Sequence, residues 1–366
     1  MKTTSPIKSE SVQKAKLIKL AVDVHANSYT FCRQVDNARL QPPQKMSPVT
    51  FVSWAVKQKS LAERVVVCYE SGPFGFVLAR ELIAKGVECV VMAAQQLDER
   101  RKHVQTDKLD TLEIASRLDR YLAGNTKALC AVKIPTVEQE RKRSEGRQRG
   151  QLHKTRNQLA AQGRSLLVLN GYTGASSWWW RGSLWESGEK CWPAEIVTLL
   201  ERWRNVLLIL EEELQGITKK VEQSLPQHLP NSLPKLPIGL GALSWVLLSR
   251  ELLQWDRFKN RREVGSFTGL IASESSSGKS QRQGHITKVG NPRVRALLVE
   301  LVWRLLQFQP EYRVVKKWRP QLNQTRSKCQ RKKIVVAMAR ETGVDLWRLA
   351  TGQTTLEKLG LRVAQD

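Results

Sequence analysis

Four acidic residues stand where the sequence predicts the end of a strand or the start of a helix. Asp23 lies in the apolar run LIKLAVDV, Glu70 closes the run RVVVCYE, and Asp107 and Asp110 follow in TDKLDTLEIASRL. A carboxylate within a buried strand is costly unless it meets a cation or several donors. Asp107 and Asp110 are three residues apart, so on a helix they share a face. Together the four could bind one or two hard cations such as Mg²⁺, which suits phosphodiester chemistry.

The same residues also admit a structural interpretation. The chain has 34 acidic residues, so four of them could match the pattern of a metal site by chance. Asp107 could cap a helix, and Asp110 could pair with a nearby Lys or Arg. His25 follows Asp23 by two residues and points to the same face of a strand. The sequence favours a structural histidine there over a catalytic one.

A serine run set among cations is the second candidate for chemistry. The stretch IASESSSGKSQRQGHITKVGNPRVR places three serines before a glycine, and Ser277, with Ser276 in reserve, is the candidate nucleophile. A serine hydroxyl needs a base or a metal to attack at neutral pH. The cations that could hold a phosphate and offset transition-state charge are Lys279, Arg282, Lys288, Arg293 and Arg295. A flexible linker is the alternative.

The elements that would position these residues fall into three regions. Alternating patterns over residues 16–132 predict a hairpin (16–36), strands at 64–70 and 87–94 and a helix at 74–86, hence an α/β domain with a mixed sheet. Residues 133–232 read as helical, with an apolar seam from Ile196 to Val221 that could join subunits or close a hairpin. Its tip is rich in tryptophan, which could stack on bases or simply pack the tip. Residues 233–355 predict a small, mostly helical domain that ends in a helix pair at 332–352.

Composition narrows the class of partner. The chain has 366 residues, is 41% hydrophobic and carries a formal net charge of +26 from 60 Lys and Arg against 34 Asp and Glu. Such an excess, spread over every region, predicts a nucleic-acid partner. No apolar run approaches the roughly 18 residues of a membrane span, and the first residues lack the apolar stretch of a signal peptide. Six scattered cysteines without a CxxC pair argue against zinc and disulfides, so we expect a reduced, cytoplasmic protein.

Taken together, AVDVH, YESGP, TDKLD and SSSGKSQRQGHITKVGNPRVRALLVE resemble the DEDD-type insertion-sequence transposases. That family is related to pilin-gene invertases and includes RNA-guided bridge recombinases. The resemblance covers nearly the whole chain in the same order. It implies a RuvC-like, ribonuclease-H-type domain, a helical coiled-coil linker and a C-terminal transposase domain that carries a catalytic serine.

The resemblance also implies a mechanism. Asp23, Glu70, Asp107 and Asp110 would be the DEDD ligands of Mg²⁺, and Ser277 or Ser276 would form a phosphoserine intermediate with DNA. Strand exchange would occur in a tetramer, and a noncoding bridge RNA would pair with target and donor DNA in the bacterial nucleoid. The high positive charge would suit a protein that holds RNA and DNA mainly through contacts to their phosphate backbones.

Two rival functions remain open at this point. A RuvC-like Mg²⁺-dependent endonuclease would use activated water and leave the serines to bind phosphate. A basic RNA-binding protein without catalysis would use the acidic residues only structurally. A covalent protein–DNA product would distinguish the transposase from both rivals.

Overall fold

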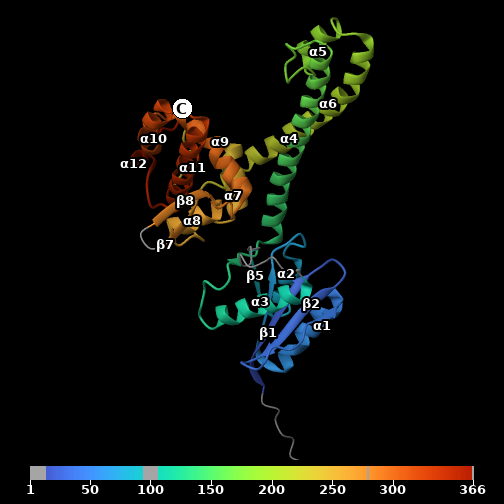
Figure 1. The fold of residues 1–366 in the computed structure, drawn as a ribbon, viewed down its shortest axis with the longest axis vertical. Coiled ribbons are helices and arrows are strands. Elements are labelled where there is room, and N and C mark those ends of the chain that lie inside the picture. Colours follow the sequence, from blue (N-terminus) through green and yellow to red (C-terminus); the bar gives the residue numbers. More distant parts are fainter. Residues whose placement is uncertain (1–13, 94–105, 278–279, 365–366) are drawn as a thin grey trace, which may run out of the picture. The chain divides into compact units, whose positions relative to one another are not determined.

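The structure is a computed structural model that describes residues 14–93, 106–277 and 280–364 (Figure 1). Within these ranges, the side chains of residues 275–277 and 280–283 are outside the description. The chain divides into two compact units, Met1–Thr136 and Val137–Asp366. Among the described helices, none is both long and apolar enough to span a membrane.

The first unit is built on a six-stranded mixed sheet with the order β3-β2-β1-β4-β5-β6. The predicted hairpin is confirmed, because β1 and β2 pair antiparallel from Ile18↔Val35 to Val24↔Tyr29. β4 lies parallel to β1, and β5 lies parallel to β4, as βαβ units require. The strands are β1 (Ala15–Val24), β2 (Tyr29–Val35), β3 (Gln44–Met46), β4 (Ala62–Glu70), β5 (Glu88–Met92) and β6 (Ala131–Val132).

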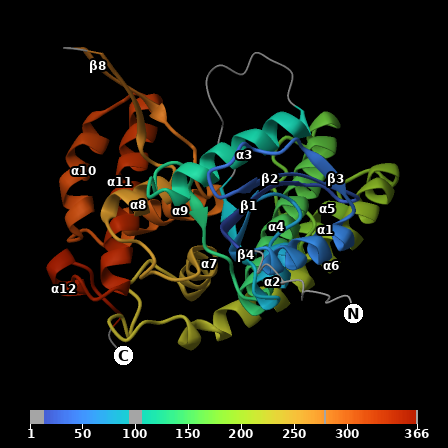
Figure 2. The ribbon, with the colours of Figure 1, turned by 90° about the horizontal axis from the view of Figure 1, so that it is seen from below.

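Helices cover both faces of this sheet (Figure 2). α1 (Pro48–Lys57), followed by the short η1 (Gln58–Ser60), and α2 (Val77–Ala84) lie on one face, and α3 (Asp107–Leu122) lies on the other. Alternation along β1 assigns its side chains: Leu20 and Val22 pack toward α1 and α2, whereas Ala21 packs toward α3. The predicted α/β domain with a mixed sheet is thus confirmed.

A charged residue is buried under α3. Lys19 is only 6% exposed, and its ammonium contacts the carboxylate of Asp119 on α3. It also donates to the backbone carbonyl of Asp36 at 2.9 Å. These acceptors compensate the desolvation of the ammonium and tie α3 to β1.

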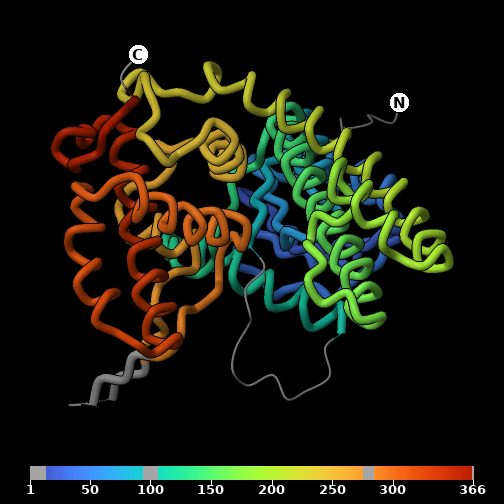
Figure 3. Tube along the Cα trace, turned by 90° about the horizontal axis from the view of Figure 1, so that it is seen from above, coloured from blue at the N-terminus to red at the C-terminus, as the bar shows by residue number. Residues whose placement is uncertain are grey.

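Two long helices form a hairpin in the second unit: α4 (Val137–Leu169) and α6 (Ala194–Gln223). They lie side by side, green and yellow-green in Figure 3. The predicted seam is confirmed in part: Ile196, Leu214 and Val221 are buried, but its members Leu199 and Val206 are 47% and 46% exposed. The buried residues Leu200, Leu207, Leu214 and Val221 recur every seven positions. The seam therefore lies in the interior of the hairpin, which was one of the two alternatives for it.

The tryptophan-rich tip is mainly a core. Trp179, Trp180 and Trp185 are at most 4% exposed, and α5 (Gly182–Glu189) contributes Trp185. Gly163 of α4 is required here, since a Cβ atom would approach Trp179 to 2.0 Å. Packing of the tip, the second alternative above, accounts for these three rings, but Trp178 is 40% exposed.

The rest of the second unit is a helical domain with one two-stranded sheet. Its elements are the short η2 (Leu225–Gln227), α7 (Ala242–Leu252), α8 (Arg261–Thr268), β7 (Ala272–Ser277), β8 (Ser280–Ile286), α9 (Pro292–Phe308), α10 (Arg313–Gln324), α11 (Lys328–Ala350) and α12 (Leu356–Leu359). The predicted mostly helical character is confirmed.

Two local predictions in this domain were wrong. The serine segment is a strand of a hairpin and not a loop, because β7 and β8 pair antiparallel over it. The predicted helix pair at 332–352 is one continuous helix, α11. Gly343 does not break it, because its missing side chain lets Leu298 of α9 approach, and that packing outweighs the low helix propensity of glycine.

Candidate metal and nucleic-acid site

The alternation of β1 directs Asp23 toward α3. Ala21 packs against the α3 side of the sheet, and Asp23, two residues later, shares that face at the end of the strand. The side chain of Asp23 is 23% exposed. It therefore lies at the rim of the core, within reach of both solvent and α3.

The start of α3 supplies the other carboxylates. Thr106 caps the helix by accepting a hydrogen bond from the backbone N–H of Leu109, so Asp107 and Asp110 fall in the first turn. Acidic groups are favourable there because the helix dipole presents partial positive charge. The cap is Thr106, so Asp107 does not serve as the cap.

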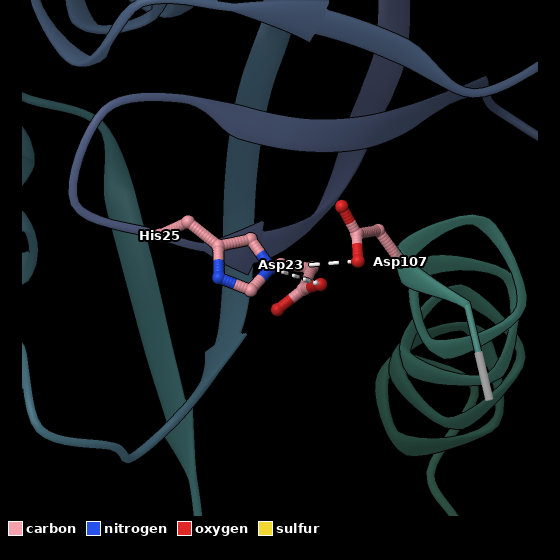
Figure 4. Close-up of side chains that lie close together, drawn as sticks. All are labelled: Asp23, His25 and Asp107. Atoms are coloured by element: carbon pink, nitrogen blue, oxygen red, sulfur yellow. Dashed lines mark hydrogen bonds and ion pairs between the residues drawn. The ribbon is translucent and has the colours of Figure 1, made fainter.

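Asp23, His25 and Asp107 converge at this edge (Figure 4). The Nε2 atom of His25 lies 3.1 Å from a carboxylate oxygen of Asp23 and 3.6 Å from one of Asp107. One ligand atom from each residue lies within 4.8 Å of the others. The structure thus brings together two of the four predicted acidic residues and the histidine beside them.

The electrostatic environment of Asp23 is crowded with negative charge. Burial raises the pKa of the Asp23 carboxyl above its ordinary value, while charge attraction and a hydrogen bond from His25 lower it, and Asp107 and Asp110 raise it further. Since a cation at this point would offset both desolvation and repulsion, the site has the charge balance of a metal-binding site.

Glu70 ends the neighbouring strand on the same side. Val66 and Cys68 of β4 pack toward α3, so Glu70, two residues later, shares their face. Because β1 and β4 are parallel, with Val22 opposite Tyr69, Glu70 and Asp23 stand at the same edge of the sheet. Glu70 and Asp110 are outside the close group of three described above.

The donor set fits a hard divalent cation. Carboxylate oxygens are the ligands that Mg²⁺ prefers, and Mg²⁺ sites in proteins use one or two carboxylates with water and phosphate for the remainder. An imidazole is a poorer ligand for Mg²⁺, and the hydrogen-bonding distance to Asp23 gives His25 an orienting role instead. This position of His25 agrees with the structural histidine favoured from sequence.

The serine segment belongs to the second unit. In the hairpin register, Ser276 pairs with Gln281 and Ser277 with Ser280. Lys279 lies outside the described residues, and for Arg282 only the backbone position in β8 is described. The structure thus places the backbone of the candidate nucleophiles at the turn end of the β7–β8 hairpin.

The other predicted phosphate-binding cations follow β8. Lys288 and Arg293 are exposed. Arg295 is partly engaged, because its guanidinium donates to the carbonyl of Thr268 at 3.0 Å. Its first role in the structure is therefore to hold the segment between α8 and α9.

A polar connection that sequence reasoning missed fixes the start of α9. Asn291 accepts hydrogen bonds from the N–H groups of Arg293 and Val294 and donates its amide to Glu251 at 2.8 Å. Glu251, 7% exposed, also accepts two hydrogen bonds from Arg147 of α4. Only the cap pattern Asn291-Pro292 was visible in the sequence, because the partners are distant along the chain.

Comparisons with known proteins show that the chain resembles transposases. Residues 238–316 match the family model described as "Transposase IS116/IS110/IS902 family". The chain is 26% identical to the transposase-like protein y4rJ of Sinorhizobium fredii over 310 residues, 80% of this chain and 78% of the relative. It is 31% identical to y4qE of the same organism, also named as transposase-like, over 68% of this chain and 61% of the relative.

A third relative is the transposase for insertion sequence element IS1111A of Coxiella burnetii, 26% identical over 75% of each chain. The chain is therefore similar to transposases over most of its length.

Proposed function

We propose that the chain is an insertion-sequence transposase that cuts and rejoins DNA with a carboxylate-bound Mg²⁺ and a serine nucleophile. The observation that carries the proposal is the convergence of Asp23 and Asp107, with Glu70 and Asp110 on the same face of the sheet edge. A structural role for these acids does not explain why like charges gather around a carboxylate whose pKa is already raised.

The DEDD carboxylates, in this proposal, hold the cation. Asp23 and Asp107 would bind it, and Glu70 and Asp110 would be the remaining ligands. When present, Mg²⁺ would polarise a phosphodiester oxygen and stabilise negative charge at phosphorus. His25 fixes the orientation of Asp23 through its hydrogen bond.

Ser277, or Ser276, supplies the nucleophile. Its Oγ forms a bond to phosphorus, the bond from phosphorus to the leaving deoxyribose oxygen breaks, and that oxygen gains a proton in place of the one lost by the hydroxyl. The product is a phosphoserine ester and a free hydroxyl on DNA, and the reverse attack by another strand rejoins the ends. Lys279, Arg282, Lys288 and Arg293 would hold the phosphate.

The partners follow from charge and resemblance. A net charge of +26 supports simultaneous contacts to the backbones of DNA and RNA. The proposal includes a noncoding bridge RNA that selects target and donor DNA by base pairing. It also includes a tetramer that brings the serine and the carboxylates to the same phosphate.

The test is trapping of a covalent product on a nicked DNA substrate with Mg²⁺ and the RNA from the flank of the element. The intact chain is compared with Ser275→Ala, Ser276→Ala and Ser277→Ala, and the adduct is located by peptide mass spectrometry. We expect one serine to carry the DNA and only its own alanine variant to lose it.

The control separates metal binding from folding. Asp23→Ala should abolish the adduct and leave RNA affinity intact. Cleavage without an adduct, unaffected by all three serine changes, would contradict the proposal and make the protein a water-using endonuclease. RNA binding with no cleavage at any Mg²⁺ concentration would leave a noncatalytic RNA-binding protein.

A further inference from the structure

A hollow lies at the tip of the α4–α6 hairpin, within the second unit. Its volume is about 660 Å³, and it is lined by one side of α4 and by Ser177, Trp178 and Trp180. Ligand sites in proteins typically occupy roughly 300–1,000 Å³. The hollow is therefore large enough for a nucleotide.

Trp178 is an aromatic wall of this hollow that packing of the tip does not explain. Its neighbours Trp179 and Trp180 are 1% exposed, whereas Trp178 is 40% exposed. The guanidinium of Arg181 lies 4.2 Å from the centre of the Trp178 ring, and that of Arg156 lies 5.2 Å from it. Both guanidinium groups lie over the ring, and a nucleobase can stack on the part of Trp178 that stays exposed.

The hollow is also positively charged. Arg156 and Arg164 line it, and the Nε of Arg164 donates to the carbonyl of Ala175 at 2.8 Å. That bond fixes the guanidinium and leaves its terminal nitrogens available to an anion. Glu211 is shared between Arg156 and Arg181 and offsets part of their charge, whereas Arg164 has no acidic partner among the described residues.

One buried donor at the hollow lacks a partner. The indole Nε1 of Trp180 is buried, and among the described residues it has no hydrogen-bond acceptor. The adjacent Trp179, by contrast, donates its Nε1 to the carbonyl of Ala160 at 2.9 Å. A buried unpaired N–H costs roughly 1–3 kcal/mol, so the packing leaves one polar group unsatisfied in this wall of the hollow.

We propose that this hollow binds one unpaired nucleotide of a single-stranded nucleic acid. The base stacks on Trp178, and the phosphate contacts Arg164. A base within a duplex is stacked and paired, so it cannot enter. The inference rests on the proposed function only in requiring that the chain bind nucleic acid, and it involves neither the carboxylates nor the serines.

The test measures binding of the full chain by fluorescence anisotropy in EDTA, which removes any metal-dependent reaction. The probes are a short oligouridylate, an oligothymidylate of equal length and a DNA duplex. Trp178→Ala should weaken single-strand binding by roughly 5- to 150-fold, the equivalent of ~1–3 kcal/mol per stacked base. Trp178→Phe should retain most of the affinity, because a ring remains.

Arg164→Gln should weaken single-strand binding. It should also reduce the slope of the logarithm of the binding constant against the logarithm of the salt concentration by about one. The matched controls are Leu184→Ala, a 47% exposed apolar residue of α5 outside the lining, and Arg202→Gln, an exposed cation of α6 also outside it. Neither control should change single-strand binding by more than about twofold, since surface substitutions away from a site have small effects.

Each outcome decides the question. Loss for both single strands supports recognition of base and phosphate, and loss for the RNA alone supports an additional contact to the 2′-hydroxyl. Unchanged affinity in Trp178→Ala, or an equal loss for the duplex, would overturn the proposal. Should Trp178→Ala not fold, Trp178→Phe and Arg164→Gln decide: unchanged single-strand affinity in Arg164→Gln overturns it. Failure of the catalytic proposal would appear in a separate experiment, as the absence of a Mg²⁺-dependent adduct between the protein and DNA.

Discussion

Replacing Asp23 by asparagine should stabilise the first unit in metal-free buffer. One ligand atom of Asp23 and one of Asp107 lie within 4.8 Å of each other. Two like unit charges at that distance repel by about 1 kcal/mol in bulk water and by about 3.5 kcal/mol at an effective dielectric constant of ~20. Because the Asp107 side chain is 46% exposed, the lower value applies. We therefore expect Asp23→Asn to raise the free energy of unfolding by about 1 kcal/mol.

The effect of Asp23→Asn on the free energy of unfolding depends on pH. Burial, with a further contribution from Asp107 and Asp110, raises the pKa of Asp23 against the opposing effect of His25. Ionised Asp23 thus lowers stability above the pKa of the unfolded chain, and this cost disappears as the pH falls through the raised folded pKa. The gain from Asp23→Asn should be largest near neutral pH, where Asp23 is ionised, and should vanish below about pH 4.

The assay is amide hydrogen exchange, measured by mass spectrometry on peptides that cover β1, because it reports on the first unit alone. In EDTA, β1 should exchange more slowly in Asp23→Asn than in the unchanged chain. Addition of Mg²⁺ at about 100 times its dissociation constant should protect the unchanged chain by about 2.7 kcal/mol, and Asp23→Asn by clearly less.

Asp119→Asn is the matched control on the same face of the sheet. It removes the carboxylate that contacts buried Lys19, so it should speed exchange of β1, with a loss of about 1–3 kcal/mol. The reasoning about Asp23 is refuted if Asp23→Asn speeds exchange as Asp119→Asn does, since Asp23 would then be a structural anchor.

Two further predictions concern the second unit. Leu207→Ala should destabilise the helical hairpin by about 2–5 kcal/mol, because Leu207 is fully buried in the seam. Leu208→Ala, at a 40% exposed position, should cost less than about 0.5 kcal/mol. Hydrogen exchange of α6 measures both effects, and equal effects would mean that the buried face is wrongly assigned. Burial lowers the pKa of His228 to about 4, so its contribution to stability is complete above about pH 6.5 and falls by up to about 3 kcal/mol as the pH drops toward 4. His228→Gln should flatten this acid slope in thermal unfolding, and an unchanged slope would contradict the assignment.

Local patterns were sufficient to predict most elements of the chain. Alternation of apolar residues marked β1, β2 and β4, and the repeat from Ile196 to Val221 marked α6, because these periods follow from backbone geometry within one element. They also put Asp23 and Glu70 at strand ends and Asp107 and Asp110 in one turn of a helix. The positions of candidate ligands along the chain were therefore determined by the sequence itself.

Local patterns failed where distant packing outweighs propensity. The glycine at Gly343 favours a break, yet α11 continues because Leu298 fits against it. The run of serines favours a flexible loop, yet β7 is held by its pairing with β8. In both places, contacts with another segment contribute more than the preference of the residue itself.

Which side chains meet was decided only by the tertiary structure. No spacing in the sequence indicates that His25 lies 3.6 Å from Asp107, or that Asn291, Glu251 and Arg147 form one connection. Three consecutive tryptophans look alike in sequence, but Gly163 makes room for Trp179, and Trp178 is left exposed beside the arginines. Periodicity assigns a residue to a face, whereas convergence at a site depends on how separate faces pack, and that packing is a property of the folded chain.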